Sequence, residues 1–214
     1  MDSSRRADGP RPETRILLIR HGETSAPERF HGAESDVGLS VRGVRQAEAL
    51  ARHLAELRPA AVCSSCMRRA LHTGRPIAEA CGVEIEVIEG LYERRMGALS
   101  GMLKTEGWDR YADEKSRWMA GDLDFASEDA EPYAAARERG VRALSEIVKR
   151  WPGQTIVVVA HGVLIKMVLA TLLDDLGPGD YDEIGIDNAA INDLRWDGSQ
   201  WRAVALNHRV EPSG

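Results

Sequence analysis

The sequence predicts an α/β fold of three layers, in which a mostly parallel central sheet lies between two layers of helices. Short apolar runs rich in β-branched residues alternate with longer segments whose apolar residues recur every three or four positions, as expected for successive strand–helix–strand units. The runs are almost wholly apolar, which is typical of strands that are buried on both faces of a parallel sheet. A less regular, aromatic-rich segment at about residues 102–132 is expected to add a small helical cap or insertion.

The first half of the chain alternates three apolar runs with two helices. Ser40 is a favourable N-cap, and the apolar residues that follow it at 3-4-3 spacing predict a helix to about residue 57. The pair Ser64-Ser65 is expected to cap a second helix that begins near residue 67 and that Pro76 would kink. The strands expected around these helices lie at residues 16–19, 60–63 and 84–88.

The second half of the chain carries the clearest regular patterns. Apolar residues on one face predict a helix over residues 133–150, and the strand expected at 155–160 is the most apolar of all. The helix expected at 163–173 is apolar on nearly every side, which implies that it is centrally buried. The dipeptide Asp197-Gly198 is a strong turn signal for a β-hairpin. The two hairpin strands are expected at residues 190–196 and 201–206.

Composition indicates a globular domain and disfavours several classes of partner. The chain has 214 residues, of which 43% are hydrophobic and 29% charged, and this length suits one domain with a substantial core. A net charge of -6 argues against binding to nucleic acid or to an anionic membrane. Three cysteines do not make a disulfide framework, so a cytoplasmic location is expected. Residues 1–13 are expected to form a flexible tail, which leaves one domain over residues 14–210.

Two of the predicted strands end in the same dipeptide. His21-Gly22 follows the first strand, His161-Gly162 follows the strand at 155–160, and Arg69 comes shortly after the end of a third strand. Ligands of an open α/β sheet bind at the carboxyl ends of its strands, so we expect these groups to converge at one edge of the sheet.

The residue types at this edge suit a phosphoryl group. Arg20 and Arg69 offer forked donors that match phosphoryl oxygens, and helix N-termini there add main-chain N–H groups and positive dipole. Glu93, on the loop after another strand, supplies a carboxyl group at the rim. A histidine after an apolar strand is a hydrogen-bonded structural residue at least as often as it is a functional one. His21 therefore becomes a candidate nucleophile only if these groups meet.

Five stretches resemble, in order, motifs of the histidine phosphatase superfamily, which is also called phosphoglycerate mutase-like. They span nearly the whole of residues 15–207, and five modest motifs in the family's order make a chance match improbable. The resemblance implies the three-layer fold and a single catalytic domain. The stretches are residues 18–24 (Leu-Ile-Arg-His-Gly-Glu-Thr), 29–32 with 39–40, 64–70 with Thr73, 91–93 with Gly97 and Gly101, and 159–162 (Val-Ala-His-Gly).

The resemblance also implies a role for each matching residue. His21 would be the nucleophile that takes the phosphoryl group, while Arg20, Arg69 and His161 would bind the oxygens of that group. Glu93 would protonate the leaving oxygen and then activate water. Because phosphoryl transfer needs mainly in-line positioning and charge stabilisation, neither a metal nor a cofactor is expected. Further candidate contacts to the phosphate ester are Thr24, Arg29, His31 and Gly162.

Attack on phosphorus requires a neutral His21, so its other ring nitrogen is expected to donate to a main-chain carbonyl or to Glu23. Arg94 and Arg95 are interpreted as exposed loop arginines, with recognition of an acidic substrate as the alternative. The aromatic residues at 104–132 are expected to belong mostly to the core, although some of them could line a substrate mouth.

Three functions remain open, and a phosphomonoester hydrolase acting on a small-molecule phosphate ester through a phosphohistidine is favoured. The alternative is a 2,3-bisphosphoglycerate-dependent phosphoglycerate mutase, because the acid loop followed by Lys104 resembles the mutase version. Against it, the segment after Gly101 is short, Val163 replaces a usual asparagine, and no double arginine lies near Arg117. An inactive phospho-ligand-binding or scaffolding protein is the third, and competent residues at every catalytic position disfavour it. A homodimer is left open.

Overall fold

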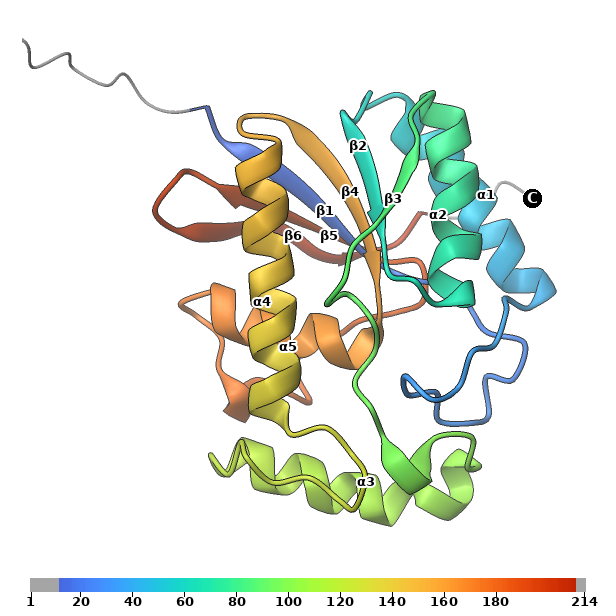
Figure 1. Ribbon diagram of the computed structural model, residues 1–214, viewed down its shortest axis with the longest axis vertical. Helices are drawn as coiled ribbons and strands as arrows, with labels where there is room; N and C mark the ends of the chain where they lie inside the picture. The colour runs from blue at the N-terminus through green and yellow to red at the C-terminus, as the bar shows by residue number, and fades with distance from the viewer. Residues whose placement is uncertain (1–11, 211–214) are drawn as a thin grey trace, which may run out of the picture.

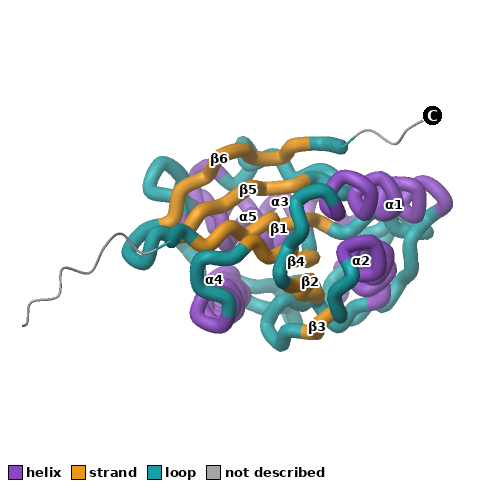
Figure 2. Tube along the Cα trace, turned by 90° about the horizontal axis from the view of Figure 1, so that it is seen from above, coloured by secondary structure: helices purple, strands orange, loops and turns teal. Residues whose placement is uncertain are grey.

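A six-stranded sheet with the order β3-β2-β4-β1-β5-β6 forms the centre of the computed structural model, which describes residues 12–210 (Figure 2). The tail expected at residues 1–13 lies, except for Pro12 and Glu13, outside the described residues. The first four strands along the chain are parallel to one another, whereas β5 pairs antiparallel with β1 and with β6. The strands are β1 (Thr14–Arg20), β2 (Ala61–Ser64), β3 (Ile85–Val87), β4 (Thr155–Ala160), β5 (Ile191–Trp196) and β6 (Trp201–His208).

Helices cover both faces of the sheet, which confirms the predicted three-layer α/β architecture. Figure 2 shows α1 (Val41–Ala55) and α2 (Arg68–Cys81) on one face, and α4 (Tyr133–Arg150) and α5 (Gly162–Leu172) on the other. The expected cap contains α3 (Lys104–Met119), which lies beyond the carboxyl ends of the parallel strands (Figure 1). Two short 3-10 helices, η1 (Gly97–Leu99) and η2 (Pro178–Asp180), complete the regular structure.

The alternation of side chains along β1 explains why its apolar run is continuous. Ile16 and Leu18 pack into the core under α4 and α5, whereas Leu17 and Ile19 pack into the core under α1 and α2. Successive side chains of a strand point to opposite faces, so a strand covered on both faces must be apolar at every position. The sheet is thereby fixed in register, and the residues that follow its strands are held at defined points.

A third core joins the cap to the rest of the domain. Tyr111 and Trp118 of α3 are buried together with Tyr133 of α4 and Tyr181, which follows η2. The hydroxyl groups of Tyr111 and Tyr181 lie 2.7 Å apart and share a hydrogen bond. The cap is therefore packed as an integral part of the domain. Of its four aromatic residues, Tyr111 and Trp118 belong to the core as expected, whereas Trp108 is exposed and Phe125 lies outside the core cluster.

The two predicted helix caps have different outcomes. Ser40 caps α1 as expected, since its Oγ accepts a hydrogen bond of 3.0 Å from the N–H of Gly43. The prediction for Ser64-Ser65 is wrong, because α2 begins after Met67, which makes no side-chain cap. Ser64 donates instead to the carbonyl of Ser65, and this use of its hydroxyl removes it from the helix start. Pro76 lies within α2, which continues to Cys81.

Across residues 12–210, the helices are either too short or too polar to span a bilayer.

Candidate active site

His21 and His161 lie side by side because they follow adjacent parallel strands. Arg20 of β1 pairs with Ala160 of β4, and the N–H of His21 donates to the carbonyl of Ala160 at 3.0 Å. The centroids of the two imidazole rings are 5.2 Å apart. From this point β1 leads toward α1 on one face and β4 leads into α5 on the other (Figure 2). Such a divergence opens a crevice at the carboxyl ends of the strands, where ligands of α/β proteins bind.

The ring of His21 is held as the neutral tautomer that a nucleophile needs. Its Nδ1 lies 2.7 Å from the carbonyl oxygen of Gly22, and since a carbonyl only accepts, Nδ1 must carry the proton. The lone pair is then on Nε2. Burial, followed by the charges of Arg69 and Arg20, holds the pKa of His21 well below its usual value of 6.5. The main-chain partner is one of the two that the sequence led us to expect.

A close approach of two main-chain segments fixes the turn after His21. A Cβ atom added at Gly22 would lie 2.7 Å from the carbonyl oxygen of Gly43, and one added at Gly43 would lie 2.1 Å from that of Glu23. Side chains at either position would force the start of α1 away from the loop. The two glycines thus allow α1 to hold the loop that carries His21.

Arg69 and His161 are fully buried behind His21. The Nε–H of Arg69 donates to Nδ1 of His161 at 3.2 Å, so Nε2 of His161 carries the proton and donates to Oγ of Ser65 at 2.8 Å. The remaining guanidinium nitrogens of Arg69 donate to main-chain carbonyls of His31, Gly32 and Ser35. Burial, with the charges of Arg69 and His21 next, holds the pKa of His161 well below its usual value. Both residues therefore lie next to His21 with their polar atoms bonded to protein groups.

Arg20 lies on the pocket side of this cluster. Its Nη1 donates to the carbonyl of Ile186 at 2.7 Å, and its Nε is buried without a hydrogen-bond partner among the described residues. A Cβ atom at Gly162 would lie 3.1 Å from that Nε, so the guanidinium group packs directly on the start of α5. Gly162 is thus the residue that leaves room for Arg20.

Glu93 occupies the N-terminus of α5. Its carboxylate accepts hydrogen bonds from the N–H groups of Val163 at 3.1 Å and Leu164 at 3.0 Å, and from Arg94 at 2.9 Å. Main-chain donors at a helix start stabilise a negative charge. Two of the free N–H groups at the start of α5, which the sequence suggests as phosphate donors, are thus bonded to Glu93.

Arg94 is buried, so the expectation of an exposed loop arginine is wrong for it, and it is not among the residues that line the cavity described below. The exposed fractions of the Arg94 and Glu114 side chains are 0% and 1%, and they form an ion pair of 2.8 Å. Nε of Arg94 donates to the carbonyl of Glu131 at 2.6 Å, and its guanidinium group lies 4.6 Å from the ring centre of Trp118. Burial by itself raises the pKa of Glu114, but the bonds and charge of Arg94, with the bond from Ser127, bring it below the usual value.

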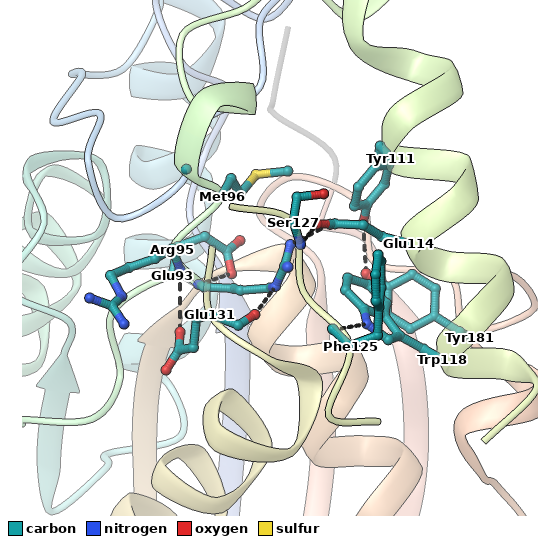
Figure 3. A network of polar contacts seen from close by, with 12 residues as sticks. Glu93, Arg95, Met96, Tyr111, Glu114, Trp118, Phe125, Ser127, Glu131 and Tyr181 are labelled. Atoms are coloured by element: carbon teal, nitrogen blue, oxygen red, sulfur yellow. Dashed lines mark hydrogen bonds and ion pairs between the residues drawn. The ribbon is translucent and has the colours of Figure 1, made fainter. Parts of the chain in front are cut away.

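A second arginine fixes the loop on the other side of Glu93. Arg139 of α4 donates to the carbonyls of Gly90 at 2.8 Å and Tyr92 at 2.6 Å, and it pairs with Glu131 at 2.8 Å. Glu131 in turn accepts from the N–H of Arg95 (Figure 3). The residues on both sides of Glu93 are therefore anchored to the cap and to α4, whereas Arg95 itself is exposed as expected.

A cavity of about 310 Å³ opens at the carboxyl ends of β1 and β4. Seven of the candidate residues line it, while Arg69 and His161 lie behind its wall. Thr24 is buried there, and Nε2 of His31 donates to the carbonyl of Ala26 at 2.7 Å. Arg29 is an exposed residue of the rim, where it donates to the carbonyl of Gly101. The seven are Arg20, His21, Thr24, Arg29, His31, Glu93 and Gly162.

Several lining residues were not predicted from the sequence. Trp108 and Tyr111 of α3 bring part of the cap into the cavity wall, which was the weaker of our two expectations for these aromatic residues. Lys166 of α5 also lines the cavity, and its signal in the sequence was that it is the single charged residue of an otherwise apolar helix. The lining is completed by Lys104 and Val163, which the comparison with mutases had singled out, and by Pro27, Phe30, Met96, Tyr181, Ile186 and Asn188, which were not predicted.

Within residues 12–210, the histidine, cysteine and acidic side chains form no group of three or more that could hold a metal ion. The positive charge of the cavity comes from guanidinium and ammonium groups instead.

The two buried histidines predict a specific dependence of stability on pH. Their pKa values are depressed in the folded state, so below about pH 6.5 the unfolded state binds more protons and acid favours unfolding. We expect the contribution of the two neutral histidines to the free energy of unfolding to be fully present above this pH. Below it, the free energy of unfolding should fall by up to about 1.4 kcal/mol per pH unit for each histidine. Urea unfolding between about pH 6.5 and 5.5 measures the slope, which the His21→Gln variant should reduce. A flat profile in both proteins would contradict burial of two neutral imidazoles.

Comparison with known proteins agrees with this geometry. Residues 16–209 match the family described as the histidine phosphatase superfamily (branch 1). A metal-independent phosphoserine phosphatase of Arabidopsis thaliana is 31% identical over 198 residues, which cover 90% of this chain and 82% of that protein. A probable phosphoglycerate mutase GpmB of Escherichia fergusonii is 29% identical over 205 residues, covering 93% of this chain and 92% of that protein.

A solved structure gives the same result for the fold. The native structure of a mycobacterial glucosyl-3-phosphoglycerate phosphatase superposes with a TM-score of 0.79 at 27% identity, and the match covers 92% of this chain and 99% of that one. The family match spans the sheet, the cap and every motif that carries the candidate site. The chain therefore belongs to the histidine phosphatase superfamily, branch 1.

Proposed function

We propose that the chain is a phosphomonoester hydrolase that moves the phosphoryl group of a small phosphorylated metabolite first to His21 and then to water, without a metal ion. The observation that carries the proposal is the neutral His21, which keeps a free lone pair on Nε2. His21 lines a cavity together with cationic groups and the carboxylate of Glu93. In this proposal residues 14–210 are one catalytic domain, and the enzyme acts in the cytoplasm.

In the first half of the reaction, Nε2 of His21 attacks phosphorus, and the bond from phosphorus to the ester oxygen breaks. The leaving oxygen takes a proton from Glu93, which acts as the general acid. Arg20 neutralises charge on the transferred oxygens from the pocket side. We propose that Arg69 and His161 do so from behind His21; each contact would replace one of their present hydrogen bonds.

In the second half, Glu93 takes a proton from water, and the oxygen of that water attacks the phosphorus of phospho-His21. Inorganic phosphate leaves, and His21 returns to its neutral form. The main-chain N–H groups around Glu93 stabilise the carboxylate that this step needs, and they hold it at the mouth of the same cavity. Two transfers thereby replace one direct attack of water on the ester, which is the advantage of a covalent intermediate.

The Glu93→Gln variant separates the acid role from simple structural support. Glutamine keeps an oxygen that can accept from the N-terminus of α5 but has no acidic proton that it can transfer to the leaving oxygen. We expect kcat for release of an alkyl alcohol to fall by about 10²- to 10⁴-fold. Formation of phospho-His21 from p-nitrophenyl phosphate should change far less, since its phenolate leaves without a proton. Burst measurements of nitrophenolate and of alcohol release test this, and equal losses in both would exclude general acid catalysis by Glu93.

A mutase remains the second candidate, because Lys104 lines the cavity after the acid loop and a probable phosphoglycerate mutase is among the relatives. The cavity wall at Val163 is apolar, which gives a retained phosphoglycerate one less polar contact. Product analysis with 3-phosphoglycerate and 2,3-bisphosphoglycerate distinguishes the two functions. A phosphatase releases inorganic phosphate, whereas a mutase forms 2-phosphoglycerate. An inactive phosphate-binding protein would do neither.

A further inference from the structure

The charges that line the cavity exceed what one phosphoryl group requires. Arg20, Arg29, Lys104 and Lys166 are cationic, whereas Glu93 is the acidic residue of the lining. Arg20 lies beside His21 at the phosphoryl end. The two lysines come from other elements, Lys104 from the start of the cap helix α3 and Lys166 from the second turn of α5.

Lys166 is the best placed of these charges. It lies one turn after Val163 on α5, and its Nζ donates to the carbonyl of Tyr181 at 2.9 Å while lying 4.7 Å from the centre of the Tyr181 ring. Within residues 12–210 it has no carboxylate within ion-pair distance. The neighbouring Lys115 shows the contrast, because Asp182 binds it at 2.5 Å.

The surroundings of Lys166 make an anionic partner favourable. The ammonium group has three donors, and one of them is used by the Tyr181 carbonyl. Burial lowers the pKa of Lys166, although the more distant charge of Asp182 opposes this, so an anion brought into contact would stabilise the charged form. The ring of the buried Tyr181 lies against the ammonium group, and a charge-assisted hydrogen bond is strengthened beside such a buried side chain.

We propose that Lys166 binds a second anionic group of the substrate, a carboxylate on the leaving-group side, and so selects phosphate esters of organic acids. The inference rests on the proposed hydrolase function. A carboxylate fits because its oxygens can accept the free donors of Lys166, whereas the phosphoryl group is already matched by the groups around His21. Lys166 would act on specificity alone and take no part in bond breaking.

A matched pair of esters tests this assignment. In 3-phosphoglycerate and glycerol 3-phosphate the phosphoryl group and carbon chain are the same, and a carboxylate in the first replaces a hydroxymethyl group in the second. We expect the wild type to favour 3-phosphoglycerate, and the ratio of the two kcat/KM values to fall by about 10- to 100-fold in Lys166→Met, mainly through KM for the acid. Lys166→Arg should keep most of the preference. Lys149→Met, an exposed lysine at the end of α4, is the control and should leave the ratio unchanged.

Two results would overturn the inference. One is a wild type that hydrolyses both esters and p-nitrophenyl phosphate through phospho-His21 without preferring the acid, and this result leaves the hydrolase function intact. The other is a Lys166→Met variant, shown to be folded by circular dichroism, that lowers kcat/KM for both esters by the same factor. A wild type that hydrolyses none of the three compounds would overturn the proposed function itself.

Discussion

The His21→Ala variant is expected to lose about 10⁴- to 10⁶-fold in kcat, as enzymes do when the nucleophile of a covalent mechanism is removed. Alanine removes the free Nε2 that would bond to phosphorus, and no other imidazole next to it has a free lone pair to take its place. Arg20 and Arg69 carry charge without a nucleophilic lone pair, and Nδ1 of His161 is engaged by Arg69. The measurement is release of inorganic phosphate from p-nitrophenyl phosphate under saturating conditions.

The matched control is His53→Ala. His53 is an exposed residue in the last turn of α1, at the opposite end of this helix from the loop that carries His21. It should retain the wild-type rate. Circular dichroism and thermal unfolding of His21→Ala should show a folded protein, since the loop is also held by the Gly22–Gly43 contact. Turnover by a folded His21→Ala variant within about tenfold of wild type would refute the nucleophile assignment.

The Glu114→Ala variant is expected to lose about 3–5 kcal/mol of unfolding free energy, which is the usual effect of breaking one side of a buried ion pair. Arg94 would keep its charge in a site that excludes water, with the Glu131 carbonyl and the face of Trp118 as its remaining contacts. The N–H of Ser127 would lose its acceptor as well. Urea unfolding at neutral pH measures the loss.

Replacing both partners provides the control for this second prediction. The double variant Arg94→Met with Glu114→Leu removes the two charges together, so it should be at least about 2 kcal/mol more stable than Glu114→Ala. Its measured stability separates the penalty of an unpaired charge from the loss of packing. A double variant that is less stable than Glu114→Ala would show that the ion pair itself stabilises the cap.

The sequence predicted the parts of the site that depend on local pattern and on the order of strands. His21 and His161 could be placed together because each follows an apolar run, and the carboxyl ends of neighbouring parallel strands meet at one edge. The tautomer of His21 also followed from chemistry, because a nucleophilic imidazole needs its other nitrogen to donate. The predicted bounds of the strand at 155–160 and of the helix at 133–150 agree with those of β4 and α4, because both segments have a strong apolar pattern.

The errors came from partners that are distant in the sequence. Arg94 stands in a charged loop, and only the folded cap brings Glu114 against it. That Glu93 bonds two N–H groups at the N-terminus of α5 was not predicted either, because nothing local shows that Glu93 reaches this helix from the acid loop. Lys166 was missed because its helix is otherwise apolar and central, so the direction of one side chain toward the cavity depends on tertiary packing.

Trapping of the phosphoenzyme tests the central claim most directly. The wild type and the Glu93→Gln variant, in which water attack should be slow, are mixed with a 32P-labelled phosphate ester and quenched in alkaline denaturant, and the labelled peptide is sequenced by mass spectrometry. We predict one phosphoryl group on His21, stable to base, lost in acid and absent from His21→Ala. Absence of any label, or a label on another residue, would contradict transfer through His21.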